Sequence, residues 1–479
     1  MRAQFLERER AEQGVAREAR FQTETASAHG EHSILFLPLR RTGTSFYAVA
    51  LAMCAVIALG VYAYTVQFRE GLGVTGLNRP VYWGFYITNF VFFIGISHAG
   101  TLISAILRVT NAEWRRPITR AAEAITVFAL CLGAPQILLD LGRPDRMFNV
   151  PIYGKMSSPI LWDLCCISVY LTGSLTYLYL PLIPDMALCR DHPGISRWRR
   201  RIYGVLSLGW SGTARQKHLL ERAIGFMAVA IIPIAISVHT VVSYIFAMTI
   251  QPMWHTAIMG PYFVVGAIFS GIASLIIAMA ILRKVMRLEK YLLPVHFKNL
   301  GLLLLTMCLL WLYFTGSEFL TTYYGAEPTH MRVFDAKFHG AYAPAFWLMV
   351  LLCFVVPFPI LAYGRTRTIA GCVVAAIAVN VGMWLERFMI VVPSLSLPRL
   401  PYSAGLYFPT WVEWSLTAAS FAMLVLLYMV FSKLFPIVSI WEIEEGREAV
   451  GPARVPAPES SPASEAPHGR PHRKGRLSW

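Results

Sequence analysis

The chain has 479 residues, of which 56% are hydrophobic and only 14% charged, and its formal net charge is +15. This composition excludes a water-soluble globular domain and an intrinsically disordered chain as descriptions of the whole protein. The basic residues are scattered over short segments between apolar runs, which argues against nucleic-acid binding and favours contact with anionic membrane lipids.

Ten apolar runs follow one another along the chain, and each is about 20 or more residues long. A run of this length can cross the hydrocarbon core as an α-helix, because lipid offers backbone groups no hydrogen-bond partners. The sequence therefore predicts an all-α polytopic membrane protein with ten transmembrane helices. They lie at about 45–67, 82–107, 118–140, 159–182, 219–248, 257–282, 299–325, 342–363, 369–391 and 411–435.

The basic residues between the runs predict the orientation in the membrane. An even number of spans places both chain ends on one side, and most lysines and arginines fall on that side. Because cytoplasmic loops carry an excess of these residues, we expect both termini in the cytoplasm. The two most basic loops contain Arg197, Arg199, Arg200 and Arg201, and Arg283, Lys284, Arg287 and Lys290.

Two pairs of similar segments suggest an internal repeat. The second apolar run begins near Gly84–Tyr86 and ends near Ala105–Arg108, and the sixth run has similar residues at its ends, Gly260–Tyr262 and Ala280–Arg283. The alternative is chance similarity between apolar helices. A repeat predicts two parallel-related four-helix bundles, flanked by one helix on each side. The predicted parts are a cytoplasmic N-terminal extension (1–43), the first helix and an outer loop (44–81), the first bundle (82–249), the second bundle (250–392), an outer loop and tenth helix (393–436) and a disordered cytoplasmic tail (437–479).

The cysteine and histidine pattern bears on cofactors. The eight cysteines form no C-x-x-C or C-x-x-C-H motif, so we expect no iron–sulfur cluster, c-type haem or metal site in the chain itself. Haem b would need two histidines at one depth. His98 and His239 differ by about 9 Å when residues are counted from the predicted outer helix ends, so we expect no intrinsic haem.

Ionisable residues inside spans are costly and point to function unless they pair at helix ends. Asp140, Asp163 and His239 all lie toward the outer side of the first predicted bundle. Gln136 is one turn from Asp140, and Ser243 one turn from His239, so each pair shares a helix face. These residues could handle a ligand, and the alternative is a set of interfacial salt bridges around a satisfied core histidine.

The segment after Asp140 reads Leu-Gly-Arg-Pro, a turn that ends the helix and is expected to aim Arg143 back toward the mouth of the bundle. Further polar residues form two other groups. Glu318, Glu386 and Arg387 in the second bundle are either second-site residues or structural pairs. His98, Thr101 and Glu123 are either the inner part of a proton path or interhelical hydrogen-bonding groups.

The ten spans, the two four-helix units and the Asp-Leu-Gly-Arg-Pro turn at 140–144 resemble the NrfD/polysulfide-reductase family of membrane subunits over residues 45–436. Leu220–Gly225 and Trp384–Phe388 look most like the quinol-oxidising subunit of alternative complex III. The resemblance implies a quinone site near the outer end of one bundle, carried here by Asp140, Arg143, Asp163 and His239. It also implies three partners: a ferredoxin-like iron–sulfur subunit on the periplasmic face, an NrfD-type paralogue and a multihaem cytochrome c.

Quinol oxidation releases two protons and two electrons, and its substrate would be menaquinol or ubiquinol. We expect His239 and one of Asp140 or Asp163 to accept the protons while Arg143 orients the carboxylates. Electrons would leave through the partner, so the chain is not catalytic alone. The outer loops 141–158, 326–341 and 392–410 would contact that partner, and proton translocation could be coupled to the reaction. The alternatives are quinone reduction in a periplasmic reductase or hydrogenase complex, a secondary transporter and a membrane anchor.

Overall fold

The computed structural model describes residues 42–192, 194–399 and 403–443, and within these ranges the regular structure is helical throughout. Ten helical segments are long and apolar enough to cross a membrane. This confirms the predicted fold class, and the ends of every span lie within five residues of their predicted positions. The spans are α2 Thr44–Glu70, α3 Phe85–Val109, α4 Thr119–Asp140, α6 Pro159–Tyr179, α9 Ala214–Ala247, α10 Met259–Val285, α11 Pro294–Gly325, the composite α13–α14 Ala343–Ala362, α15 Ile369–Ser396 and α16 Trp411–Leu434.

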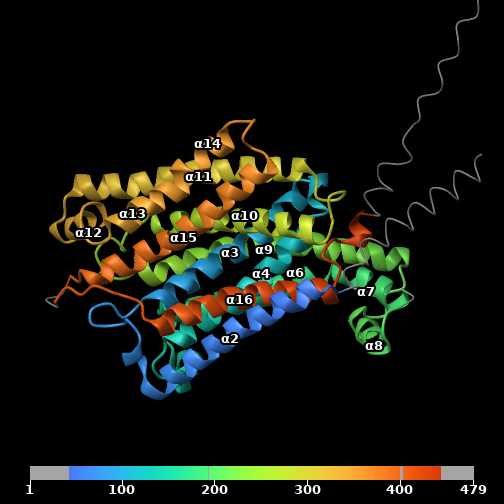
Figure 1. The fold of residues 1–479 in the computed structure, drawn as a ribbon, viewed down its shortest axis with the longest axis horizontal. Helices are drawn as coiled ribbons and strands as arrows, with labels where there is room; N and C mark the ends of the chain where they lie inside the picture. Colours follow the sequence, from blue (N-terminus) through green and yellow to red (C-terminus); the bar gives the residue numbers. More distant parts are fainter. Residues whose placement is uncertain (1–41, 193, 400–402, 444–479) are drawn as a thin grey trace, which may run out of the picture.

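The short helices mark the two ends of the molecule. The helices α7 (Leu182–Asp191) and α8 (Arg197–Leu206) lie at the end where α2 begins and α16 ends, which we call the terminal face (Figure 1). The helix α12 (Pro328–Phe338) lies at the other end, which we call the opposite face (Figure 1). The helix α5 (Asn149–Tyr153) follows α4 in the loop that joins α4 to α6.

The spans pack as two rings of four. In the first ring α3 contacts α4 and α9, and α6 contacts the same two helices. In the second ring α10 contacts α11 and α15, while the composite α13–α14 packs against α15 and α11. The rings meet mainly where α3 packs on α10. The grouping follows the chain order expected from the sequence, and the repeat relation between the two groups stays a prediction.

The first and last spans do not flank the bundles on two sides. They pack against each other, and α16 also contacts α3 and α4 of the first ring (Figure 1). Gly60 permits this close approach, because a Cβ added there would lie 2.3 Å from Cβ of Ala419. The expectation of one helix on each side is therefore wrong, since a span's position in the chain does not say which neighbour its small residues can approach.

The eighth span is interrupted where α13 (Ala343–Val350) passes through a π-helical turn, Leu351–Val355, into α14 (Pro357–Ala362). Pro357 has no N–H to donate to the carbonyl of Cys353 one turn earlier. The thiol of Cys308 on α11 lies 3.3 Å from that carbonyl oxygen and donates to it instead. A buried cysteine thus replaces the missing backbone donor.

Charged side chains buried at the terminal face hold the end of the chain in place. Arg120 pairs with Asp185 of α7 and donates to the carbonyls of Pro436 and Pro181, at 3.0 and 2.9 Å. Asp185 also accepts from the backbone N–H of Ile440 at 3.1 Å. The segment 437–443 is therefore packed on the protein, and the prediction of a disordered tail is wrong for it. Residues 444–479, and the extension 1–41, lie outside the described residues.

A second ion pair completes this region, which we call the terminal ionic network: Arg108, Arg120, Asp185 and Glu442. Glu442 pairs with Arg108 at the end of α3, and Arg115 lies 3.6 Å from the same carboxylate. Burial raises the pKa of Asp185, whereas the neighbouring Arg120 opposes that rise. The network ties α3, α4 and α7 to the segment after α16.

Candidate functional site

Two histidines from different helices touch at the centre of the molecule. The ring centroids of His98 on α3 and His239 on α9 are 4.5 Å apart, and both side chains are buried. The ring nitrogens of His98 lie 2.6 Å from the carbonyl oxygen of Ile94 and 2.8 Å from that of Ala235. A neutral imidazole can donate to only one of these oxygens. Among the described residues, neither ring nitrogen of His239 has a hydrogen-bond partner.

This contact overturns the predicted difference in depth between the two histidines. His98 is 13 residues from the start of α3, and His239 is eight from the end of α9. Because their rings touch, the ends of the two helices cannot lie at the same level, and a count along each helix does not capture that offset. The contact therefore brings His98 to the depth of His239, and a role for His98 in the inner part of a proton path stays a prediction. The expectation that the chain holds no haem loses this argument and stays a prediction.

Asp163 lies on the same helix face as a residue that contacts the histidine pair. The ring of Tyr170 on α6 is 4.9 Å from the ring of His98, and its hydroxyl donates to the carbonyl of Ser97 at 3.1 Å. Asp163 precedes Tyr170 by seven residues, which is two turns, or about 10 Å along α6 toward the opposite face. Its carboxylate is buried, and one oxygen has no partner among the described residues. Asp163 and the histidines are thus arranged along one side of α6.

An arginine and a glutamate from the second ring lie close to His239. The ring centroid of Phe263 is 5.8 Å from that of His239, and the guanidinium carbon of Arg387 lies 4.8 Å from the same Phe263 centroid. Arg387 Nη1 is 3.1 Å from Glu386 Oε2, and both side chains are 1% exposed. A Cβ at Gly266 would lie 2.5 Å from Arg387 Nη2, so only glycine leaves room for this guanidinium.

We call His98, Tyr170, His239, Glu386 and Arg387 the central polar cluster. A further acid–base pair lies between it and the opposite face. Glu318 on α11 accepts a hydrogen bond from Thr256 at 3.3 Å, and Lys337 of α12 is buried near Glu318 and Glu386. Burial lowers the pKa of Lys337 to about 8, although both carboxylates oppose that shift. Lys337 was not among the site residues expected from the sequence, because hydropathy places it in a loop outside the predicted spans.

Asp140 lies in a different environment from His239. It ends α4 near Glu413 of α16 and Tyr86 of α3. Gln67 of α2 donates to the carbonyl of Leu139 at 2.6 Å and accepts from the hydroxyl of Tyr86 at 2.5 Å. No hydrogen bond or ion pair among the described residues joins Asp140, Asp163 and His239 to one another.

The glutamate beside Asp140 has a structural role. Glu413 caps α16 by accepting from the backbone N–H of Thr410 at 2.9 Å, and it also accepts from Gly76 at 2.7 Å. A hydroxyl residue followed three positions later by glutamate is a helix-start pattern that the sequence displays at 410–413. That pattern could have identified Glu413, which was not among the residues expected at the site.

Arg143 does not orient the carboxylate of Asp140. Its side chain is 64% exposed, and it forms two hydrogen bonds with Asp145, at 2.8 and 3.0 Å. The local Arg-Pro-Asp sequence supplies a carboxylate two residues away, and this short-range partner holds the guanidinium at the surface. Gln136 likewise points elsewhere, because its amide donates to Ser420 of α16 at 2.9 Å. Ser243 donates to Thr240 of its own helix at 2.6 Å.

The residues expected to form an inner path have these positions. The carboxylate of Glu123 accepts a hydrogen bond from the hydroxyl of Ser104 at 2.6 Å, and the Ser104 hydroxyl is 3.2 Å from that of Tyr177. These three side chains lie between the central polar cluster and Glu442. Thr101 is buried beside Tyr170. The polar groups are therefore spaced from the cluster toward the terminal face, and the role of this series in proton transfer stays a prediction.

One group on the opposite face could hold a metal ion, contrary to the expectation of no such site. Ligand atoms of His255, Glu327 and His330 all lie within 4.8 Å of one another. Two imidazoles and a carboxylate form a donor set that suits Zn²⁺. Burial lowers the pKa of His330 while Glu327 opposes that shift, and a lower pKa favours the neutral imidazole that a metal ion requires. Arg399 is close to Glu327 and His330 and disfavours a cation there.

Comparison with known proteins places the chain among membrane subunits. Over 228 residues it is 29% identical to a putative dimethyl sulfoxide reductase membrane subunit of Halobacterium salinarum, an alignment that covers 47% of this chain and 49% of that protein. It is 24% identical to an Hdr-like menaquinol oxidoreductase integral membrane subunit of Archaeoglobus fulgidus, covering 86% of this chain and 99% of the relative. It is 23% identical to the integral membrane subunit of a menaquinone reductase of Nitratidesulfovibrio vulgaris, covering 77% and 86%.

A family model, polysulphide reductase NrfD, matches residues 73–398. That stretch runs from the loop after α2 to the end of α15, so it contains both rings and the central polar cluster. The chain belongs to the polysulphide reductase NrfD family.

Proposed function

We propose that the chain is the quinol-oxidising membrane subunit of a respiratory electron-transfer complex in a bacterial inner membrane. Two relatives that align over most of their length are named for menaquinol and menaquinone chemistry, which supports a quinone as the substrate. The fine assignment to alternative complex III rests on the two sequence motifs at 220–225 and 384–388.

The central polar cluster carries the proposal. A histidine with no hydrogen-bond partner for either nitrogen, close to a buried arginine–glutamate pair, is a costly arrangement within a membrane-spanning bundle. Such groups are retained where they exchange protons or bind a polar ligand. Histidine and carboxylate are the side chains that most often accept protons in catalysis.

In the proposed mechanism the quinol ring enters between helices of the first ring near the opposite face. Asp163 accepts a proton from one hydroxyl, because its carboxylate is buried there with one oxygen unpartnered. The second proton passes to His239 and the His98 imidazole in contact with it. Asp140 remains a candidate acceptor from the neighbouring helix end, and Arg143, exposed on the following turn, is a candidate for contact with a partner rather than with the carboxylate.

The two electrons leave to an iron–sulfur subunit on the opposite face, which is periplasmic in this proposal. Apolar side chains in the loop 141–158 support a protein contact there: Ile152 and Tyr153 are 65% and 77% exposed, and Met156 is 84% exposed. Large apolar residues grouped in a loop outside the spans are typical of protein interfaces. The proposed complex also contains an NrfD-type paralogue and a multihaem cytochrome c.

The direction of electron flow distinguishes this proposal from its main alternative. A quinone-reducing subunit would use the same residues in reverse, and one relative is named as a menaquinone reductase. Purified complex that reduces an artificial acceptor on addition of menaquinol, but does not reduce menaquinone with a low-potential donor, would support oxidation.

The test uses the complex isolated with its partner subunits. The variant Asp163→Asn should lower menaquinol-dependent turnover by about a hundredfold or more, the usual contribution of a proton acceptor. It should also weaken binding of a menaquinol analogue. Glu113→Gln serves as the control, because that carboxylate is 70% exposed at the terminal face and lies outside both proposed sites. Equal turnover and equal analogue binding in Asp163→Asn and the control would contradict the proposal.

A further inference from the structure

The helix α8 has an exposed apolar side, although it lies outside the spans. Trp198, Ile202 and Val205 are 55%, 43% and 74% exposed and follow one another at a spacing of four and three residues. Residues at this spacing share one helix face. The opposite side of α8 is anchored by Tyr203, whose ring is buried and whose hydroxyl donates to the carbonyl of Leu434 at 2.6 Å. The helix is therefore held against the bundle with an apolar face uncovered.

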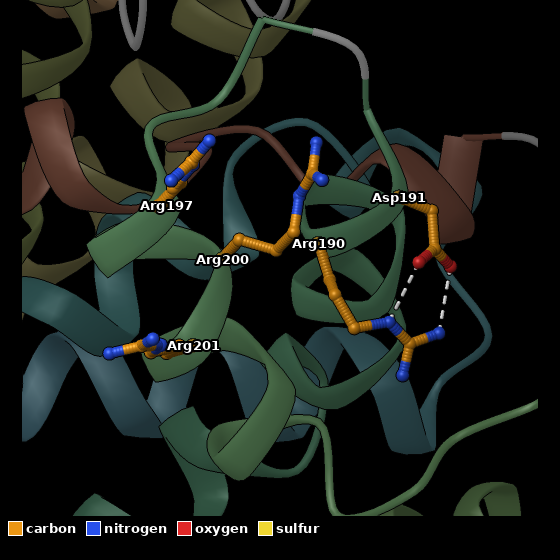
Figure 2. A pocket seen from close by; sticks show the side chains of 5 residues that line it. All are labelled: Arg190, Asp191, Arg197, Arg200 and Arg201. Carbon is orange, nitrogen blue, oxygen red and sulfur yellow. Dashed lines mark hydrogen bonds and ion pairs between the residues drawn. The ribbon is translucent and has the colours of Figure 1, made fainter.

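Arginines surround a hollow beside this apolar face. Figure 2 shows Arg190 and Asp191 at the end of α7, and Arg197, Arg200 and Arg201 on the first turns of α8. The hollow has a volume of about 560 Å³. Arg190 forms two hydrogen bonds with Asp191, at 2.8 and 2.7 Å, which Figure 2 marks with dashed lines. Among the described residues, Arg197, Arg200 and Arg201 form no ion pair with a carboxylate.

The charge balance of the hollow identifies the chemistry of its ligand. The five lining residues include four guanidinium groups and one carboxylate, so the lining carries a net charge of +3. Guanidinium groups bind phosphate oxygens through paired N–H donors. A phosphate would therefore complete the charge balance, because within the described part of the chain the Asp191 carboxylate forms its ion pair with Arg190.

The position of the hollow selects the source of that phosphate. The uncovered apolar face of α8 is next to it, and both lie at the terminal face, where α6 ends and α9 begins. A helix with an apolar side and a strongly basic side lies in the interface of a membrane with its apolar residues among the acyl chains. A soluble phosphate would account for the arginines but would leave Trp198, Ile202 and Val205 in water.

We infer that the arginine hollow between α7 and α8 binds the phosphate headgroup of an anionic phospholipid from the leaflet at the terminal face. The acyl chains lie along the apolar face of α8. The inference stands independently of the proposed quinone chemistry, because it concerns the other end of the molecule.

The bound lipid should also stabilise the fold. The helix α7 contains Asp185 of the terminal ionic network, and α8 packs against α7. A ligand that bridges α7 and α8 binds only when both are in place, so it raises the stability of the folded state by mass action. Lipid binding is thus expected to raise the midpoint of thermal unfolding.

The test measures lipid retention by native mass spectrometry of the complex in mild detergent. Diphosphatidylglycerol and phosphatidylglycerol are the anionic probes, and phosphatidylcholine is the neutral one. The wild type should retain an anionic lipid, and the triple variant R197Q/R200Q/R201Q should lower that retention at least about tenfold, since each basic residue near an anionic surface contributes to binding. The matched control R215Q/K217Q/R365Q removes three exposed basic charges outside the hollow and should behave as the wild type.

Three results would overturn the inference. The first is a difference of less than twofold in retained anionic lipid between the two triple variants. The second is retention of phosphatidylcholine as strong as that of the anionic probes. The third is displacement of the lipid by inorganic phosphate at millimolar concentration, with a rise in the unfolding midpoint of the delipidated complex, which would assign the hollow to a soluble anion. An independent result would support the inference: diphosphatidylglycerol raises the unfolding midpoint of the wild type but not that of R197Q/R200Q/R201Q, although this variant has normal secondary structure.

Discussion

Two regions of the bundle bury charged side chains, and they differ in how completely those charges are partnered. In the terminal ionic network, Arg120 contacts Asp185, two backbone carbonyls and Ser439, while Asp185 accepts two backbone N–H groups. In the central polar cluster, Arg387 and Glu386 pair with each other, Glu386 also lies close to Tyr262 and Trp311, and neither ring nitrogen of His239 has a hydrogen bond of good geometry among the described residues.

This difference separates structural from functional charge. A buried ion pair stabilises a fold only when further hydrogen bonds compensate for the water that both groups have lost. The terminal ionic network meets that condition and joins elements distant in the chain. The central polar cluster does not, so its residues reduce stability and are expected to be retained for chemistry.

The largest expected effect is on stability and comes from breaking the terminal ionic network. Arg120→Met leaves Asp185 buried without its counter-charge and should lower the free energy of unfolding by about 3–5 kcal/mol. Turnover per folded complex should be unchanged. Thermal unfolding in detergent, together with turnover normalised to folded protein, measures both. A stability loss below about 1 kcal/mol would remove the contrast between the two regions.

The next effect is on turnover and comes from neutralising the pair in the central polar cluster. The double variant E386Q/R387M removes both charges together, so stability should stay within about 2 kcal/mol of the wild type or increase. Quinol-dependent turnover should fall about a hundredfold, because an electrostatic contact of this kind typically contributes that much. The charge pair would be structural if the variant kept full turnover but unfolded readily.

Lys337 sharpens the comparison through pH. Burial lowers its pKa to about 8, so between pH 8 and the unfolded value the folded state binds fewer protons than the unfolded state. The folded state therefore gains stability as pH rises through 8, by at most about 1.4 kcal/mol per pH unit. Lys337→Met should abolish this dependence, which unfolding midpoints measured from about pH 7 to pH 10 can show. Parallel curves for both proteins would argue that Lys337 is solvated.

The smallest effect is expected at an ion pair on the terminal face in which the carboxylate is exposed and the guanidinium is largely buried. Arg116 Nε lies 2.6 Å from Glu113 Oε2, and this contact lowers the pKa of the Glu113 carboxyl. The side chain of Glu113 is 70% exposed. Because solvent screens such pairs, Glu113→Gln should change stability by about 0.5 kcal/mol or less. A larger loss of stability in the same unfolding experiment would contradict the comparison. It would show that the distance between two charges, rather than the number of their hydrogen-bond partners, determines how much an ion pair stabilises this protein.

The fold was largely predictable because one physical requirement dominates it. Lipid forces every span to be a helix of sufficient length, so hydropathy alone locates all ten. Packing between spans follows from smaller features. Gly60 brings α16 against α2, and Pro357 interrupts the eighth span, yet a sequence contains many glycines and prolines that do neither.

The candidate site was predictable by residue type but not by arrangement. His239, Asp163, Glu386 and Arg387 were identified because ionisable groups inside spans are rare. Their neighbours depend on helix offset and rotation, which periodicity does not specify. The sequence therefore separated His98 from His239, although their rings touch, and it directed Arg143 toward Asp140 although Asp145 is closer in the chain.

The most direct test of the account is the turnover of His239→Gln, which keeps a polar side chain of similar length but cannot be protonated. In the assembled complex, menaquinol-dependent electron transfer should fall at least about a hundredfold, with unfolding behaviour and the set of assembled subunits unchanged. His218→Gln, at an exposed histidine near the start of α9 on the terminal face, provides the control. Wild-type turnover in His239→Gln would contradict the assignment of the unpartnered imidazole to proton transfer, and with it the distinction between the two buried regions.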